Sequence, residues 1–281
     1  MPQTIFRYGG EYGHTIHMAV ANGFPPQVYQ PLLQPLAQEY NVVSLPPRPM
    51  WTNPPPSDEF TSWEETAVDL IKALRLFHLK DVIGIGHSLG AVATMIAATK
   101  KPGLFRGIVL LDPTIFPPRL LWTLKAMRII GLEGRMPLVR RALNRRAHFA
   151  DAQEAFQYWR GKKLFEDWTD EALWLYVTGL TAPNDNGDDG LMLTWSPEWE
   201  ARYYATIYTE SWKVIGQLEG LLPILVIRGT YTNTFFEPAA ELMQKRVPSM
   251  TYAEVEGGHL FPQSAPNPTR DIIEDWLETL D

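Results

Sequence analysis

A serine flanked by small residues carries the clearest chemical signal in the chain. Residues 82–98 read VIGIGHSLGAVATMIAA, and Gly86-His87-Ser88-Leu89-Gly90 within them fits G-x-S-x-G. This pattern follows an apolar run typical of a strand and precedes a helical run, which is the context in which such a serine stands on a sharp strand-to-helix turn. Bulky side chains beside the serine would collide with the strand and the helix, so the neighbouring residues must be small. Gly86, Gly90 and Ala91 meet this requirement. The sequence therefore predicts that Ser88 is a nucleophile.

A serine hydroxyl needs a base to become an effective nucleophile. His259 has the most suitable context, because it lies in EVEGGHLFP, a glycine-rich turn just after the last expected strand. A histidine that follows the serine and lies near the end of the chain fits this arrangement. Four other histidines are expected to be strand, helix or insertion residues: His14, His17, His78 and His148. The fifth, His87, lies beside the serine, but its side chain is expected to point elsewhere.

An oxyanion formed on attack by the serine needs two N–H donors. We expect one from Leu89, the residue after the nucleophile. The other is expected from Phe24 in Ala21-Asn22-Gly23-Phe24-Pro25, the loop after an expected strand at 14–20. Asn22-Gly23 is alternatively a simple tight turn.

The elements that must position these residues alternate between strands and helices. Strands are expected at 14–20, 41–45, 81–86, 107–111, 223–229 and 250–255, and helices at 29–39, 62–77, 91–100, 237–246 and 267–280. Such alternation predicts a mostly parallel sheet covered by helices on both faces. Residues 113–222 read instead as helices and loops. The chain is thus divided into a core, 1–112 and 223–281, and an inserted helical cap, 113–222.

These segments resemble those of the α/β-hydrolase fold family. GHSLGA resembles its nucleophile elbow, NGFP its oxyanion segment, and GGH its histidine loop. The resemblance implies a doubly wound, mostly parallel sheet with the cap inserted after the sixth core strand, a serine–histidine–acid site, and no metal or organic cofactor. A serine at the elbow points away from the dehalogenase and epoxide-hydrolase branches, which use an aspartate there.

The acid of such a triad is not evident. The family's usual place is the turn after the seventh strand, but Gly229–Thr234 reads GTYTNT and contains no carboxylate. Asp112, at the end of the 107–111 strand, is the first candidate, although it is also suited to be a structural turn residue before a proline. Asn233 or Thr232 is a possible neutral substitute. The third possibility is a protein without efficient catalysis that binds a ligand.

The insertion is rich in aromatic and basic residues. Seven of the ten tryptophans lie there, which suggests either an apolar pocket over the serine or the packing of a small cap: Trp122, Trp159, Trp168, Trp174, Trp195, Trp199 and Trp212. The basic amphipathic stretch 135–149 is interpreted mainly as a solvated helix face, with an anionic surface as the alternative. NDNGDDG at 184–190 is interpreted as an exposed turn.

The composition and net charge of the chain exclude some classes of function. The chain has 281 residues, no cysteine and a net charge of −7, which excludes thiol chemistry and argues against general nucleic-acid binding. The first residues lack a signal-peptide pattern, and no apolar run has the roughly 20 residues that span a bilayer. We therefore expect a cytoplasmic location and no stable membrane insertion; the oligomeric state is open.

Together these features predict a hydrolase that cleaves an ester or related acyl bond of a small, hydrophobic substrate through an acyl-enzyme at Ser88. Lactonases, C–C-bond hydrolases and cofactor-free perhydrolases use similar residues and remain alternatives. A non-catalytic ligand-binding module of the same fold is the alternative from a different class.

Overall fold

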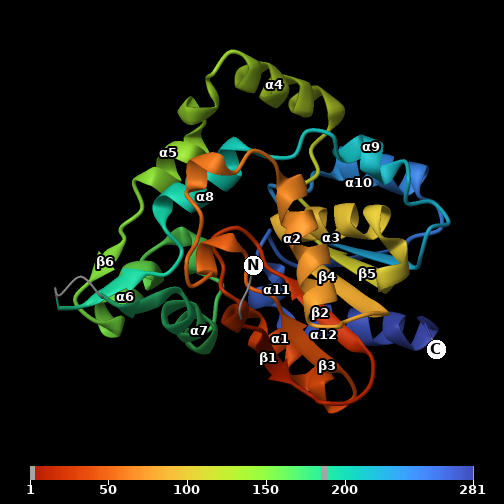
Figure 1. Ribbon diagram of the computed structural model, residues 1–281, viewed down its shortest axis with the longest axis horizontal. Helices are drawn as coiled ribbons and strands as arrows, with labels where there is room; N and C mark the ends of the chain where they lie inside the picture. Colours follow the sequence, from red (N-terminus) through yellow and green to blue (C-terminus); the bar gives the residue numbers. More distant parts are fainter. Residues whose placement is uncertain (1–3, 185–188, 281) are drawn as a thin grey trace.

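A seven-stranded sheet forms the centre of the computed structural model, which describes residues 4–184 and 189–280 (Figure 1). The strand order is β1-β3-β2-β4-β5-β9-β10. The first pair, β1 with β3, is antiparallel, and all the other pairs are parallel. The bounds are β1 Phe6–Gly9, β2 Thr15–Ala19, β3 Asn41–Ser44, β4 Val82–His87, β5 Phe105–Leu111, β9 Ile224–Gly229 and β10 Thr251–Val255. The expected parallel sheet is therefore present.

Helices cover the sheet. The core helices are α1 Gln30–Leu33, α2 Trp63–Leu76, α3 Leu89–Lys100, α10 Glu237–Arg246, α11 Phe261–Ser264 and α12 Pro266–Leu277. Of these, α3 packs on β2, β4 and β5, whereas α12 packs on β9 and β10. In Figure 1 they lie on opposite sides of the strands. The adjacent strands β4, β5 and β9 are buried almost throughout, as a sheet covered on both faces requires.

Some sequence expectations about these elements were wrong. The helix expected at 29–39 is three short pieces, η1 Pro26–Tyr29, α1 and η2 Pro35–Gln38, because the prolines of this segment sit at the starts of successive turns. The final helix begins at Pro266 rather than at Asn267-Pro268. The edge strand β1 was not expected, because its short and partly polar sequence gave no strand pattern.

Between β5 and β9 the chain leaves the central sheet. Its helices are α4 Pro118–Ile129, α5 Pro137–Leu143, α6 Ala152–Arg160, α7 Asp170–Leu180, α8 Pro197–Ala205 and α9 Ser211–Ile215. The expectation of helices and loops alone was wrong, since β6 His148–Phe149, β7 Thr181–Pro183 and β8 Leu191–Leu193 form a small antiparallel sheet. Part of the turn interpreted at 184–190 lies outside the described residues. We retain the division into core and cap as a proposal.

Candidate active site

The serine of the G-x-S-x-G pattern stands on a strained turn between β4 and α3. Ser88 has φ 57° and ψ −116°, a left-handed conformation that costs free energy for a residue with a side chain. A Cβ on Gly86 would lie 2.5 Å from the carbonyl oxygen of Gly90, and a Cβ on Gly90 would lie 2.1 Å from that of Ala19. The two glycines are therefore required by close backbone approach, as the sequence indicated.

His259 lies within hydrogen-bonding distance of the serine. Its Nε2 is 2.9 Å from the Ser88 hydroxyl oxygen. The loop that carries it, after β10, packs closely on the end of β9, where a Cβ on Gly229 would lie 2.6 Å from the carbonyl oxygen of Gly258. The backbone N–H of Tyr231 also donates to the carbonyl of Gly257. The histidine is thus fixed by the turn that follows the neighbouring strand.

Asp112 completes the arrangement from the end of β5. Its Oδ2 is 2.6 Å from His259 Nδ1, and its side chain is fully buried. Its φ is 39°, and its own N–H donates to the carbonyl of Ile227 on β9. The positive φ turns the chain at the sheet edge and brings the carboxylate towards the neighbouring loop. The carboxylate that was sought after the seventh strand is therefore supplied by the strand beside it.

The geometry fixes the directions of the hydrogen bonds. A buried carboxylate accepts, so His259 Nδ1–H donates to Asp112 and the ring's Nε2 accepts from the Ser88 hydroxyl. Thr114, whose Oγ1 is 3.0 Å from the Ser88 oxygen, must then be the donor in its own bond with the serine. Thr114 was missed by sequence reasoning, although it lies two residues after Asp112 and carries a hydroxyl at the carboxyl end of a strand.

The turn after β9 donates two hydrogen bonds to Asp112. Thr232 Oγ1 donates to Asp112 Oδ2 at 2.6 Å, and the Gly229 N–H donates to Oδ1 at 3.1 Å. Asn233 lines the same cavity, but its side-chain oxygen accepts from the Thr234 hydroxyl at 3.3 Å. Within the part of the chain that the structure describes, Asn233 makes no hydrogen bond to His259. The arrangement therefore favours Asp112 over Asn233 or Thr232 as the partner of the histidine.

The two expected oxyanion donors differ in their bonding. Leu89 is the first residue of α3, so its N–H has no acceptor within the helix. The N–H of Phe24, in contrast, donates to the carbonyl of Ala21 at 3.2 Å and closes a turn that contains Gly23 at φ 78°. Both residues line the cavity in front of the serine. Phe24 can serve an oxyanion only by sharing or exchanging its present acceptor.

His87 connects three parts of the site. Its Nε2 lies 2.9 Å from the carbonyl of His259, and its Nδ1 lies 2.8 Å from the Tyr29 hydroxyl. Because a carbonyl only accepts, Nε2 carries the proton and Tyr29 donates to Nδ1. Tyr29 in turn accepts from the N–H of Ala21 at 3.0 Å. Burial, and secondly repulsion between the two rings when His259 is protonated, holds the pKa of His87 well below its usual value, so His87 stays neutral. Its side chain does point away from the serine, as expected.

A cavity of about 630 Å³ opens in front of Ser88. This volume suits a small organic molecule. Its apolar walls are Phe24, Trp63, Phe116, Trp168, Ile207 and Leu260. Exposed charged residues from the insertion also border it, namely Arg141, Lys163, Glu166 and Asp167. Of the seven tryptophans in the insertion, Trp168 alone lines this cavity, and most of the others pack the interior of the insertion itself.

An ion pair within the insertion lies against the loop that carries Phe24, beside Gly23. Arg145 bonds both the carboxylate of Glu200 and the hydroxyl of Tyr176. Glu200 also accepts, through its backbone carbonyl, a bond of 3.0 Å from the side-chain amide of Asn22. Burial raises the pKa of Tyr176 to about 12 although the guanidinium of Arg145 lowers it, so its hydroxyl stays protonated. The roof of the cavity is therefore tied to the loop that carries Phe24.

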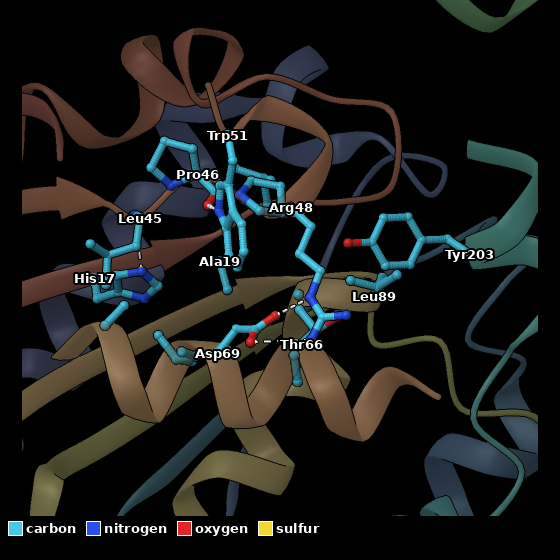
Figure 2. Close-up of a pocket in the computed structure, with 16 residues that line it drawn as sticks. His17, Ala19, Leu45, Pro46, Arg48, Trp51, Thr66, Asp69, Leu89 and Tyr203 are labelled. Carbon is cyan, nitrogen blue, oxygen red and sulfur yellow. Dashed lines mark hydrogen bonds and ion pairs between the residues drawn. The ribbon is translucent and has the colours of Figure 1, made fainter. Parts of the chain in front are cut away.

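A second, much smaller cavity lies behind the elbow, with a volume of about 40 Å³ (Figure 2). Figure 2 shows Arg48 reaching Asp69 across it, in an ion pair of 2.5 Å. Tyr203, from α8 of the insertion, and Leu89 also border the space. This volume holds no more than a few water molecules, so we assign the substrate to the larger cavity beside Ser88.

Comparison with known proteins agrees with this architecture. A family model described as the alpha/beta hydrolase family matches residues 16–272. Abhydrolase domain-containing protein ACTT2-1 of Alternaria alternata is 25% identical over 234 residues, covering 70% of this chain and 83% of the relative. Ethanol acetyltransferase 1 of Hanseniaspora uvarum is 24% identical over 233 residues, covering 77% of this chain and 65% of the relative.

Solved structures show the same fold at low sequence identity. E-2-(acetamidomethylene)succinate hydrolase superposes with a TM-score of 0.79 at 19% identity, covering 98% of this chain and 94% of that one. The thioesterase domain from the curacin biosynthetic pathway gives 0.75 at 14% identity, covering 96% and 94%. With the family model matched over most of its length, the chain belongs to the alpha/beta hydrolase family.

Proposed function

We propose that this protein is a serine hydrolase that cleaves an ester or related acyl bond through an acyl-enzyme at Ser88. The observation that carries the proposal is the continuous hydrogen-bonded series from the Ser88 hydroxyl through His259 to the buried Asp112, at 2.9 and 2.6 Å. Nucleophile, base and orienting carboxylate are the parts that acyl transfer requires.

The reaction has two halves. In the first, Ser88 Oγ attacks the acyl carbon while His259 Nε2 takes its proton. The oxyanion receives a hydrogen bond from the N–H of Leu89 and another from that of Phe24, which shares or gives up its bond to the Ala21 carbonyl. The intermediate collapses, and His259 returns the proton to the leaving group. In the second half, water attacks the acyl-enzyme with His259 as base, and the acid product leaves with Ser88 restored. Asp112 stays ionised and stabilises the imidazolium.

The cavity supports a small substrate with an apolar acyl or alcohol part. Aromatic side chains, including Phe24, Phe116 and Trp168, line the space in front of the serine, and burying each apolar carbon against them contributes about 0.8 kcal/mol. Four of the charged residues that border the cavity are exposed residues of the insertion, and the fifth, Glu200, is paired with Arg145, so they do not require a charged substrate at the serine itself.

The ligand-binding alternative is less well supported than catalysis. A module that only binds a ligand has no need for a strained serine, or for a buried carboxylate within 2.6 Å of a histidine. Strained conformations and buried charges both cost free energy, and they are typically kept where chemistry uses them. The hydroxyl and N–H donors around Asp112 keep that carboxylate ready to hold a histidine rather than a ligand.

Labelling with a fluorophosphonate tests the proposal without knowledge of the substrate. Purified protein is treated with the reagent, and intact mass is followed over time for the wild type and for Ser88→Ala and Asp112→Asn. We expect one adduct on the wild type and none on Ser88→Ala. Asp112→Asn is expected to slow labelling by several orders of magnitude, since loss of the acid in a serine triad costs about 10⁴ in turnover.

The outcomes separate the hypotheses. Absence of labelling in folded wild-type protein would contradict the hydrolase and favour the binding module. Fast labelling in both the wild type and Asp112→Asn would keep the nucleophile but remove Asp112 from the triad. A series of p-nitrophenyl esters of increasing chain length then measures the preferred acyl group, with longer apolar chains expected to raise kcat/KM until the cavity is filled.

A further inference from the structure

The helix α4 presents an apolar row to solvent. Trp122, Ala126, Ile129 and Ile130 are spaced i, i+4, i+7 and i+8, so they lie on one face of the helix. The exposed fractions are 71% for Trp122, 78% for Ile129 and 65% for Ile130. Two isoleucines and a tryptophan exposed side by side at the edge of the molecule cost free energy in water.

This row is not the face by which α4 is attached. The opposite side carries Leu121, which is buried, and Arg128, which donates to the carbonyls of Ala205 and Ile207. Lys125 pairs with Glu210 at 2.8 Å. Figure 1 shows α4 at the upper edge of the molecule, apart from the central sheet. The helix is therefore held in place through one side, and its apolar row is left open to a partner.

The arm that carries this row is strongly basic. Residues 118–143, which include α4 and α5, contain six arginines and lysines and one acidic residue, in a chain that has 25 basic and 32 acidic residues in all. Arg119 lies three residues before Trp122, on the same face of α4. Within 4–184 and 189–280, the side chains of four exposed arginines of the arm make no ion pair and no hydrogen bond: Arg119, Arg135, Arg140 and Arg141.

We propose that the arm formed by α4 and α5 (residues 118–143) docks on an anionic lipid bilayer. An apolar row flanked by basic residues, with a tryptophan among them, is the pattern of a segment that lies in a membrane interface. Unpaired arginines near an acidic surface add about 1 kcal/mol each. The arm does not span the bilayer, and no helix among the described residues is long and apolar enough to do so.

A second copy of the chain fits this surface less well. The exposed row consists of a few side chains on one helix, whereas a stable dimer buries about 1,200–2,000 Å² in total. The arginines would also need a concentrated acidic patch opposite them. An anionic bilayer suits both the small apolar row and the arginines, because single apolar side chains can enter its interface and its surface is negatively charged throughout.

The docked arm also borders the cavity of the proposed active site. Leu138 and Arg141 of α5 line that cavity, and Leu138 is 40% exposed. Docking would therefore hold the cavity next to the bilayer, where apolar esters concentrate. Binding itself does not depend on the proposed chemistry, so it can be tested in protein without the serine.

Vesicle flotation tests the proposal in the Ser88→Ala background, so that no turnover alters the lipid. The probes are vesicles of phosphatidylcholine alone and of phosphatidylcholine with phosphatidylserine, at low and high salt. We expect binding to the phosphatidylserine vesicles that weakens as salt rises. Trp122→Gln and Ile129→Gln should each lower the partition coefficient roughly tenfold. Arg140→Gln and Arg141→Gln should each lower it about fivefold.

Matched controls lie on α2, away from the arm. Leu76→Gln removes a leucine that is 51% exposed, and Arg75→Gln removes an exposed arginine, so both should leave binding unchanged. The proposal is overturned if the anionic vesicles bind nothing, or if the α4 variants bind as tightly as their parent. It is also overturned if light scattering shows a dimer that Trp122→Gln dissociates, since the row would then be covered by a second copy.

Discussion

Thr232 and His259 share one acceptor, because both lie 2.6 Å from Oδ2 of Asp112. The threonine comes from the turn after β9, where the family's acid was expected, and the aspartate comes from the end of β5. The end of β5 therefore supplies the carboxylate beside the histidine, and the turn after β9 supplies a hydroxyl that donates to this carboxylate.

Thr232→Val is expected to slow fluorophosphonate labelling of Ser88. The change keeps the shape of the side chain but removes a donor to a buried carboxylate, and such bonds contribute about 1.5–3 kcal/mol. We expect a loss of roughly tenfold or more, largely restored by Thr232→Ser. Asn233→Ala is the matched control, since Asn233 bonds Thr234 and not the acid. A larger loss in Asn233→Ala than in Thr232→Val would show that Asn233 holds the histidine.

Gly90→Ala should prevent or severely weaken folding. A Cβ at this position lies 2.1 Å from the carbonyl oxygen of Ala19, so β2 and α3 would have to separate. Overpacking of this kind costs about 1–3 kcal/mol or more. Gly103→Ala is the control, because its Cβ meets nothing within 4 Å. Urea unfolding of the two variants measures the difference, and equal stability would show that the elbow tolerates a side chain.

The free energy of unfolding should fall in mild acid through two buried histidines. Burial lowers the pKa of His17 from 6.5 to about 3, and burial also lowers that of His87. Because the unfolded chain binds these protons first, stability is complete above about pH 6.5 and declines as pH falls towards the folded values. Each histidine adds a slope of about 1.4 kcal/mol per pH unit.

The variant His17→Gln measures how much His17 contributes to the pH dependence of the free energy of unfolding. Urea unfolding between about pH 6.5 and pH 5, above most carboxylate titration, should show a mean slope reduced by about 1 kcal/mol per pH unit relative to the wild type, since the unfolded histidine is only half protonated at the upper end. The amide oxygen of the glutamine can still accept from the N–H of Leu45, which His17 Nε2 now does at 3.2 Å. An unchanged slope would mean that His17 titrates normally in the folded protein.

Breaking the ion pair between Arg145 and Glu200 should cost far more than breaking a surface pair. The side chains are 12% and 14% exposed, and a buried charge left without its partner costs about 3–5 kcal/mol. Glu200→Gln is therefore expected to lower the free energy of unfolding by a few kcal/mol. The pair between Arg146 and Glu154 is 42% and 40% exposed, so Glu154→Gln should change it by less than about 1 kcal/mol. If Glu200→Gln and Glu154→Gln lowered the free energy of unfolding by similar amounts, burial would not decide the cost of breaking these pairs.

Local patterns predicted much of the core. Ser88, with its flanking glycines, was identified because a sharp strand-to-helix turn permits only small neighbours, and α10 begins at Glu237 as expected. Elements whose sequence departs from simple periodicity were missed or misjudged. These include the edge strand β1, the proline-broken segment at 26–38 and the small sheet β6-β8-β7 of the insertion.

Other features depend on contacts between distant segments. Most tryptophans of the insertion pack its interior rather than the cavity, a choice that composition does not reveal. Thr114 and His87 were not recognised as parts of the site, because their roles come from hydrogen bonds to Ser88, Tyr29 and the backbone of His259.

The sequence by itself determined the family and the parallel order of strands and helices, and it predicted the serine and histidine of the site, because each is encoded in a short contiguous pattern. Only the tertiary structure decided which group meets that histidine. Asp112 and His259 are separated by 147 residues, and the pairing of β5 with β9 and of β9 with β10 brings their loops to one edge of the sheet. A carboxylate's distance from an imidazole is set by strand register and turn geometry, which no local pattern specifies.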